Sequence, residues 1–188
     1  MLLDIAPLMS PLAAVQRVLR RFKNQGMIIG GVAASLLGKP RLTADVDAVL
    51  LLSTDDLPRL MEAVTREGLL PRIRDAEGFA RRYRILLLRH EASGIHVDIS
   101  LGVLPFEVEA VKRSVMHQVG KLSIRLPTPE DLIILKAVAH RPQDLLDIQA
   151  VLNNEPELDR ERVRYWVCEF ARALDMPELW TDIASWIG

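Results

Sequence analysis

Cysteine is almost absent from this chain, since Cys168 is the only one among 188 residues. A single cysteine excludes an internal disulfide and a zinc site built on several cysteines, and it suits a reducing compartment. No apolar run approaches the roughly 18 residues that a membrane-spanning helix needs, and residues 1–4 carry no basic group of the kind that opens a secretion signal. We therefore expect a cytoplasmic protein with no membrane partner.

An excess of charge of one sign is also missing. The chain has 24 basic and 25 acidic residues, and its formal net charge of -1 excludes the overall basic character of many nucleic-acid-binding proteins. Six arginines do stand between positions 72 and 89. They could guide an RNA or another phosphate-rich acceptor, or they could form a solvated strand face. Phe79 and Tyr83 are too few aromatic residues to indicate a platform for stacked bases.

The composition that is present is that of a globular protein, with 49% hydrophobic and 26% charged residues. The length suits one domain, or one domain with a small helical appendage. We predict an α/β (α+β) fold in which a small mixed-sheet core over residues 1–126 carries a helical region over residues 127–188 packed on it. The predicted helices span 10–23, 32–37, 55–67, 129–140, 142–152, 160–174 and 177–187, and the predicted strands span 27–29, 44–52, 83–90 and 96–101.

A pair of acidic residues marks the most informative stretch of the chain. Gly30 and Gly31 end a short apolar run, and after a short helical run Asp45 and Asp47 open a predicted strand. Alternate side chains of a strand share a face, so both carboxylates should point the same way. Like charges that close raise each other's pKa unless a cation lies between them, and Mg²⁺ is the usual oxygen-ligated candidate. Asp98, on a strand that follows a predicted hairpin turn, offers a third ligand.

These motifs, in this order, resemble the polymerase-beta-type nucleotidyltransferase superfamily in its AbiEii-like, minimal nucleotidyltransferase branch. The resemblance covers most of the chain. An isolated Asp-x-Asp would be weak, whereas four elements in the family's order are fairly specific. The four are the glycine pair Gly30-Gly31, the stretch from Arg41 to Asp47, the segment Val97-Asp98-Ile99, and a helical motif that runs from Pro127 through Lys136 to Ile148.

The resemblance implies transfer of a nucleoside monophosphate from an NTP such as ATP to an acceptor, with two Mg²⁺ ions. The acceptor stays open among an RNA, a partner toxin or antitoxin protein, and a small molecule. A role in a toxin-antitoxin system is part of what the resemblance implies. It assigns catalysis and metal binding to Asp45, Asp47 and Asp98, and nucleotide binding to Gly30, Gly31, Arg41, Thr43 and Lys136.

Each of these residues also has a simpler interpretation. The three acids could be a solvated strand end and a surface acid, and Lys136 could be a helix lysine with a buried stem and a solvated amine. Salt bridges or helix caps are the simpler roles expected of Asp144 and Asp147. For the whole protein, the alternative is a non-catalytic nucleotidyltransferase-fold protein that acts as a binding or antitoxin module.

Overall fold

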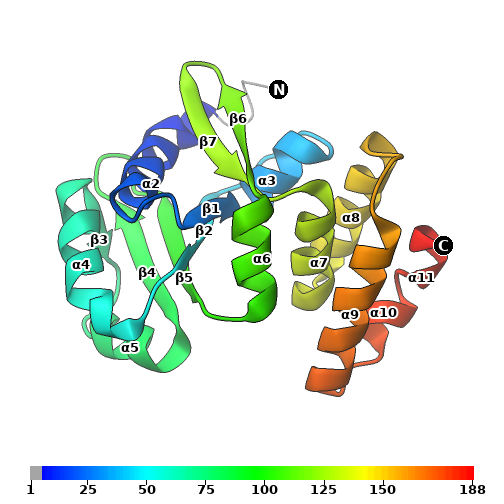
Figure 1. Cartoon of the computed structure of the whole chain (residues 1–188). Coiled ribbons are helices and arrows are strands. Elements are labelled where there is room, and N and C mark those ends of the chain that lie inside the picture. Colours follow the sequence, from blue (N-terminus) through cyan, green and yellow to red (C-terminus); the bar gives the residue numbers. More distant parts are fainter. Residues whose placement is uncertain (1–5) are drawn as a thin grey trace.

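A five-stranded mixed sheet forms the centre of the computed structural model, which describes residues 6–188 (Figure 1). The strand order is β1-β2-β5-β4-β3, in which β2 and β5 run parallel and the other neighbours run antiparallel. A separate hairpin pairs β6 with β7. The predicted mixed sheet is therefore confirmed. The strands are β1 (Gly26–Ile29), β2 (Asp45–Leu51), β3 (Leu69–Pro71), β4 (Ile85–His90), β5 (His96–Gly102), β6 (Val115–Val119) and β7 (Leu122–Leu126).

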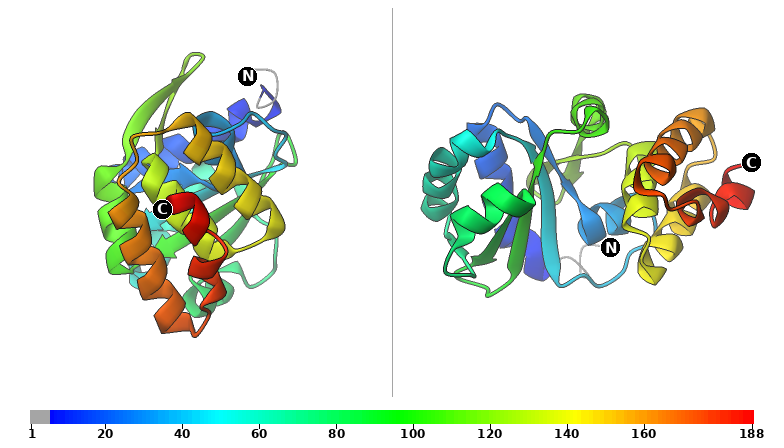
Figure 2. Two further views of the ribbon diagram at one scale, coloured as in Figure 1. Left: turned by 90° about the vertical axis from the view of Figure 1, so that its right-hand side faces the viewer. Right: turned by 90° about the horizontal axis from the view of Figure 1, so that it is seen from below.

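Helices are interspersed among the strands up to β7, where β4–β5 and β6–β7 follow each other directly, and the helices after β7 then follow one another. Figure 2 shows these last helices together at one end of the molecule, beside the sheet. The helices are α2 (Met9–Arg21), α3 (Gly30–Leu37), α4 (Leu57–Arg66), α5 (Ala76–Tyr83), α6 (Pro105–Arg113), α7 (Pro129–Ala139), α8 (Pro142–Asn154), α9 (Arg160–Leu174), α10 (Glu178–Thr181) and α11 (Ala184–Ile187), with short 3₁₀ turns η1 (Ala6–Leu8) and η2 (Thr54–Asp56).

Most predicted elements are present with shifted ends. The helix expected over 32–37 begins two residues earlier, so the glycine pair forms the first turn of α3. The strand expected over 83–90 begins only at Ile85, because residues 76–83 form α5 behind the N-cap of Asp75. The helix expected over 177–187 is the two short helices α10 and α11. The sequence analysis missed α5, α6, β3, β6 and β7.

The two faces of the central sheet differ in polarity. Val46 on β2 and Val97 and Ile99 on β5 are completely buried on one face, and the amphipathic helices α2 and α4 pack against the sheet. Asp47 and Asp98 stand at alternate positions on the opposite face and are only partly buried. The strand period predicted for these residues is therefore present, and it leaves their carboxylates on the face away from the apolar layer.

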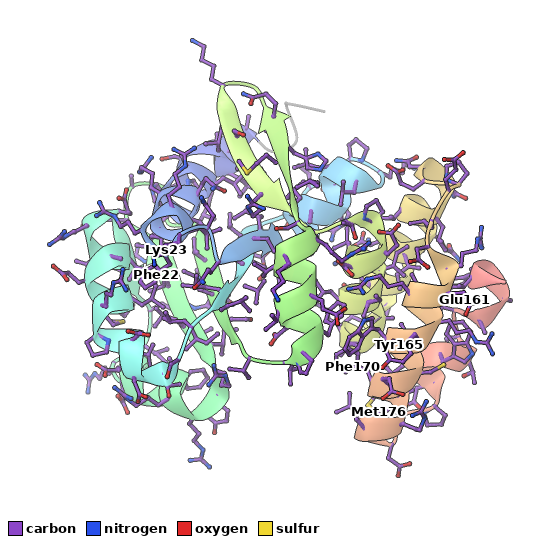
Figure 3. All side chains as sticks on the ribbon, viewed as in Figure 1. Phe22, Lys23, Glu161, Tyr165, Phe170 and Met176 are labelled. Carbon is purple, nitrogen blue, oxygen red and sulfur yellow. The ribbon has the colours of Figure 1, made fainter. Side chains whose placement is uncertain are left out.

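The helical region after β7 packs on the sheet portion through α3, which contacts both α7 and α8. Figure 3 shows side chains filling the space between α9 and α6, with Phe170 among them. Phe106 of α6 meets Trp166 and Phe170 of α9 edge to face, with ring centroids 5.3 and 5.6 Å apart. The buried apolar side chains of both regions form one continuous cluster. The division at residue 126 stays a prediction.

None of the helices within residues 6–188 has the length and apolar character needed to cross a membrane. Residues 1–4, from which the absence of a secretion signal was expected, lie outside the described part of the chain.

Candidate active site

The three acids lie together on the polar face of the sheet because of the register between β2 and β5. Asp47 stands directly opposite Asp98 in this parallel pair, and Asp45 stands opposite His96. Strands paired in this way lie about 4.8 Å apart, so opposite side chains on one face are neighbours. His96 is exposed and lies outside the cleft that the acids line.

The glycine pair allows the backbone of α3 to approach this row of acids. Gly30 has a φ of 66°, in the left-handed region that favours glycine. A Cβ atom at this position would overlap the carboxylate of Asp47, and one on Gly31 would overlap the side chain of Thr43. Thr43 in turn donates its hydroxyl hydrogen to Asp45, with 3.1 Å between the oxygens. The two glycines therefore make room for the acids and for the residue that orients one of them.

Asp47 is an acid whose charged form is disfavoured by its surroundings. Its pKa is raised to about 6, first by burial and then by the neighbouring charges of Asp45 and Asp98, while the charges of Arg141 and Lys136 oppose the rise. Within residues 6–188, no side chain or main-chain group donates a hydrogen bond to its carboxylate. A half-buried carboxylate without a donor is costly unless a cation or a proton neutralises it.

Asp98 differs from Asp47 because an arginine holds it. Nη2 of Arg72 donates to both carboxylate oxygens, at 2.7 Å from Oδ1 and 2.9 Å from Oδ2. Burial raises the pKa of Asp98, and the adjacent guanidinium of Arg72 opposes that rise without cancelling it. The charge of Asp98 thus already has a partner within the protein.

A cleft of about 270 Å³ lies between the acid row and the helical region. Gly30, Asp45, Asp47 and Asp98 line one side of it, together with Ile29 and Ser100. The opposite side comes from α7 and the start of α8, and consists of Leu132, Leu135, Lys136, Ala139, Arg141 and Asp144. The cleft therefore places carboxylates from the sheet opposite cationic groups from the helices.

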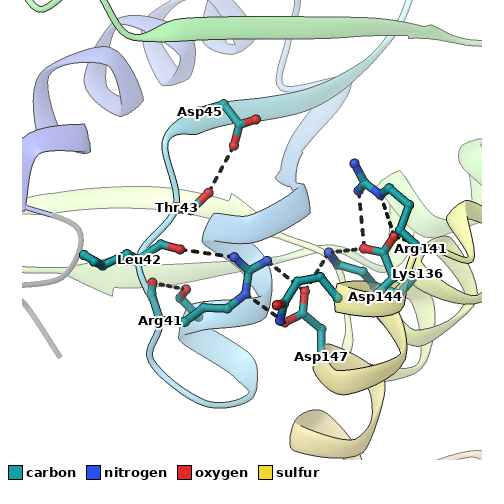
Figure 4. A network of polar contacts seen from close by, with 10 residues as sticks. Arg41, Leu42, Thr43, Asp45, Lys136, Arg141, Asp144 and Asp147 are labelled. Carbon is teal, nitrogen blue, oxygen red and sulfur yellow. Dashed lines mark hydrogen bonds and ion pairs between the residues drawn. The ribbon is translucent and has the colours of Figure 1, made fainter.

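A network of ion pairs centred on the buried Lys136 lies on the helical side of the cleft. Lys136 is only 4% exposed, and its amine lies 2.7 Å from Asp144 and 2.8 Å from Asp147. Arg41 binds Asp147 through Nε and Nη2, at 2.8 and 2.9 Å, and Arg141 binds Asp144 at 2.7 Å. Figure 4 shows Lys136 among these residues, with the two arginines on either side.

The ion pairs hold the two acids of this network in their charged form. Burial raises the pKa of Asp144, but hydrogen bonds from Arg141 and Lys136 outweigh it and leave that pKa below its ordinary value. Burial likewise raises the pKa of Asp147, and hydrogen bonds from Arg41 and Lys136 outweigh it. The salt-bridge role expected of both acids is confirmed, and Lys136 is a buried lysine rather than one whose amine reaches solvent.

The residues expected at the site are partly assembled. Asp45, Asp47, Asp98, Gly30 and Lys136 line one cleft. The remaining three do not line it. Thr43 contacts Gly31 and binds Asp45, which lines the cleft. Arg41 binds Asp147, and both line a separate pocket beside α8. The sequence analysis missed Arg141 and Ser100 as cleft residues. Arg141 stood within the quoted helical motif and could have been found there, whereas Ser100 shares the strand face of Asp98.

The arginines between positions 72 and 89 do not form one free surface. Arg72 is paired with Asp98, Arg84 donates to two main-chain carbonyls, and Arg81 donates to Glu77. Guidance of a phosphate-rich acceptor by this segment stays a prediction, with fewer charges to support it. The exposed arginines that remain are Arg74, Arg82 and Arg89.

The acids are not gathered around a single point. No group of three or more histidine, cysteine, aspartate or glutamate side chains in the described chain is placed to hold a metal ion. Two of the three carboxylates already have partners in the protein, Asp45 in the hydroxyl of Thr43 and Asp98 in the guanidinium of Arg72. The carboxylate oxygens are of the kind that Mg²⁺ selects, and the charges of Arg141 and Lys136 offset only part of the rise in the pKa of Asp47. The donor set therefore suits a divalent cation, although the ligands are not yet closed around one.

The mixed sheet, the glycine turn and the acid row together define a nucleotidyltransferase-like fold. A nucleotidyltransferase-like antigenic protein from Paracoccidioides brasiliensis superimposes with a TM-score of 0.53 over 95% of this chain and 91% of that chain, at 14% sequence identity. The antibiotic-resistance factor ANT(2'')-Ia superimposes with a TM-score of 0.53 over 90% of this chain and 95% of that chain, at 16% identity. At such identities the likeness shows the fold alone.

The sequence identifies the family more narrowly. Residues 15–180 match the family described as nucleotidyl transferase AbiEii toxin, type IV toxin-antitoxin system, and the chain belongs to this family. No curated protein matches the chain. The family named from the sequence motifs is thereby confirmed.

Proposed function

We propose that this protein transfers a nucleoside monophosphate from an NTP to an acceptor hydroxyl in a reaction that depends on Mg²⁺. Membership of the AbiEii family supports nucleotidyl transfer in general. The observation that carries the finer proposal is the state of Asp47, a half-buried carboxylate with a pKa of about 6 between two other acids. A divalent cation bound there would remove the cost of that charge.

The residues that would hold the metal are Asp45, Asp47 and Asp98. Two Mg²⁺ ions at such a site supply activation of the attacking oxygen and neutralisation of the leaving phosphates. Asp98 in its ionised form can also accept the proton of the acceptor hydroxyl. The acceptor oxygen then bonds to the α-phosphorus, the bond from that phosphorus to the bridging oxygen breaks, and pyrophosphate leaves with the electron pair.

The helical side of the cleft supplies the positive charge for the triphosphate. Arg41, Lys136 and Arg141 face only two carboxylates in their network, so one positive charge remains uncompensated within it. We assign Arg141, which is exposed and lines the cleft, as a phosphate-binding residue beside Lys136. The main-chain N–H groups of Gly30 and Gly31, in the first turn of α3, add donors for phosphate oxygens.

The roles of Arg41 and Thr43 in this proposal are indirect. Arg41 neutralises Asp147 and so leaves the amine of Lys136 less compensated. Thr43 orients Asp45 through its hydroxyl. Both residues therefore support groups that contact the metal or the nucleotide.

The biological setting follows from the family description. We propose a toxin of a toxin-antitoxin pair in the cytoplasm, with an antitoxin as partner and an RNA, a protein or a small molecule as acceptor. The family is described as a type IV system, and this supports the partner.

A labelled-NTP transfer assay on a double variant tests the enzyme. Asp45→Asn with Asp47→Asn should abolish transfer and should also abolish the Mg²⁺-dependent rise of Tm that each preferred NTP produces in the wild type. Asp56→Asn is the matched control, because Asp56 is exposed and its side chain caps no helix in the structure. Transfer that survives in the double variant would overturn the assignment of the acids.

The alternative is a binding or antitoxin module that keeps the fold without chemistry. Asp98, which Arg72 neutralises, is the observation that favours it. In that case the double variant would bind its partner as the wild type does, and neither the wild type nor the double variant would consume an NTP.

A further inference from the structure

Arg72 lies in the same row across the sheet as two of the acids, Asp98 and Asp47. It follows β3 directly, and its main-chain N–H donates to the carbonyl of Leu87, with 3.1 Å between the nitrogen and the oxygen. Leu87 stands opposite Asp98, and Asp98 stands opposite Asp47. Residues in one row point to one face, so the guanidinium of Arg72 reaches over Leu87 toward the candidate metal site.

In the contact between Arg72 and Asp98, one guanidinium nitrogen lies between the two carboxylate oxygens, as a chelated metal ion would. A single nitrogen, Nη2, lies 2.7 Å from one carboxylate oxygen and 2.9 Å from the other. The two side chains are about a quarter exposed, at 23% and 25%, so solvent screens the pair only in part. A metal ion chelated by Asp98 would need the space that this nitrogen occupies.

We propose that Arg72 is a positioning residue that holds Asp98 away from Asp45 and Asp47 and competes with the divalent metal for this third carboxylate. The inference rests on the proposed function of the same site. Completion of the metal site then requires that Arg72 release Asp98. The absence of a closed three-acid group in the described chain agrees with this restraint.

Other nearby arginines do not share this role. Arg84 donates to the main-chain carbonyls of Leu52 and Leu101 and so stabilises the end of α5 and the start of β4. Arg74, two residues after Arg72, is exposed and takes part in no ion pair with a described residue. Arg74 therefore carries the same charge in the same neighbourhood without contact to the acids, and it serves as the control.

The test is a calorimetric titration of the full chain with Mn²⁺ alone, without nucleotide. Arg72→Gln should bind Mn²⁺ about tenfold more tightly than the wild type, because the competing cation and its repulsion of the metal are both removed. Arg74→Gln should stay within about twofold of the wild type, since its charge is solvated and screened. Melting in EDTA, measured first, should show that both variants are folded.

A third variant tests whether the gain passes through Asp98. Arg72→Gln combined with Asp98→Asn should lose the tighter binding, because the released carboxylate is no longer present. Unchanged or weaker binding by Arg72→Gln would overturn the inference and make Arg72 a supporting residue of the site. An equal gain in Arg74→Gln would also overturn it, in favour of a general charge effect. If Mn²⁺ binds neither the wild type nor any variant, the metal site of the proposed function fails, and this inference fails with it.

Discussion

At the scale of single residues, Asp47 is a carboxylate whose burial and acidic neighbours disfavour its negative charge. Asp47 has Asp45 two residues earlier on its own strand and Asp98 opposite it on β5. No group in the described chain donates a hydrogen bond to its carboxylate. Its neighbour Asp98 has Arg72 as an internal counterion. In the proposed function, Asp47 would therefore bind a metal ion directly, whereas Asp98 would first have to be released by Arg72.

The pH dependence of stability should report this state of Asp47. Its folded pKa of about 6 lies above the ordinary 3.8, so the folded protein binds the proton more tightly than the unfolded chain does. Without metal, the contribution of Asp47 to the free energy of unfolding should therefore fall by about 2 to 3 kcal/mol as pH rises from 4 to 7. Asp47→Asn should lack this fall and should be more stable than the wild type at pH 7.5 in EDTA.

Urea unfolding at several pH values measures both proteins, and Asp56→Asn is again the control. Addition of Mg²⁺ should stabilise the wild type more at pH 7.5 than at pH 5, because the ion competes with a proton at the lower pH. Equal pH profiles for the wild type and Asp47→Asn would show that the pKa of this carboxylate is not raised in the folded protein.

At the scale of elements, the start of α3 and the end of the loop before β2 are fitted to each other. Gly30 and Gly31 form the first turn of α3, and their missing Cβ atoms leave room for Asp47 and Thr43. Gly30 also lines the cleft. The glycine pair therefore makes room for these two side chains, and in the proposed function its main-chain N–H groups would also bind phosphate oxygens.

Alanine substitutions at two glycines separate backbone strain from this overlap. Gly30 and Gly68 both have φ near 70°, at 66° and 70°, but nothing lies within 4 Å of a Cβ on Gly68. Gly68→Ala should cost about 1 kcal/mol from the left-handed backbone alone. Gly30→Ala should cost about 3 kcal/mol, because the new methyl group also displaces the carboxylate of Asp47.

Urea unfolding gives both values, and combination of Gly30→Ala with Asp47→Ala should recover the part that is due to overlap. Similar losses at the two glycines would mean that Asp47 moves aside at no cost.

At the scale of the whole molecule, a charged network connects the sheet portion to the helices. Lys136 of α7 binds two acids of α8, and one of them, Asp147, also binds Arg41 from the loop before β2. The surrounding apolar core is continuous across the same boundary. The relative position of the acid row and the cationic wall of the cleft therefore depends on both kinds of contact.

Removal of the central lysine should destabilise the protein strongly. Lys136→Met leaves Asp144 and Asp147 buried without their shared cation, and we expect a loss of about 3 kcal/mol in the free energy of unfolding. Lys121→Met is the control, because Lys121 is exposed in the β6–β7 hairpin. A loss no larger than that of Lys121→Met would mean that the two arginines alone neutralise the acids.

Much of the fold was readable from local patterns. The strand period around Asp45 and Asp47, the turn before β5 and the caps of α7 all depend on residues close in sequence, and local geometry decides them. The elements β3 and α5 escaped because neither shows a clear apolar pattern: β3 is two leucines followed by a proline, and α5 mixes small, charged and aromatic residues. Their discovery mattered, since the end of β3 is the place from which Arg72 reaches Asp98.

The sequence by itself determined the family, the mixed α/β architecture and the three acids with their shared strand face. Strand alternation and motif order are local properties, so one chain is enough to reveal them. Only the tertiary structure decided which cations those acids meet. The pairing of Arg72 with Asp98 and of Lys136 with Asp144 and Asp147 depends on sheet register and helix packing, which bring distant residues within hydrogen-bond distance. Charge in a folded protein is set by such neighbours, and no local pattern encodes them.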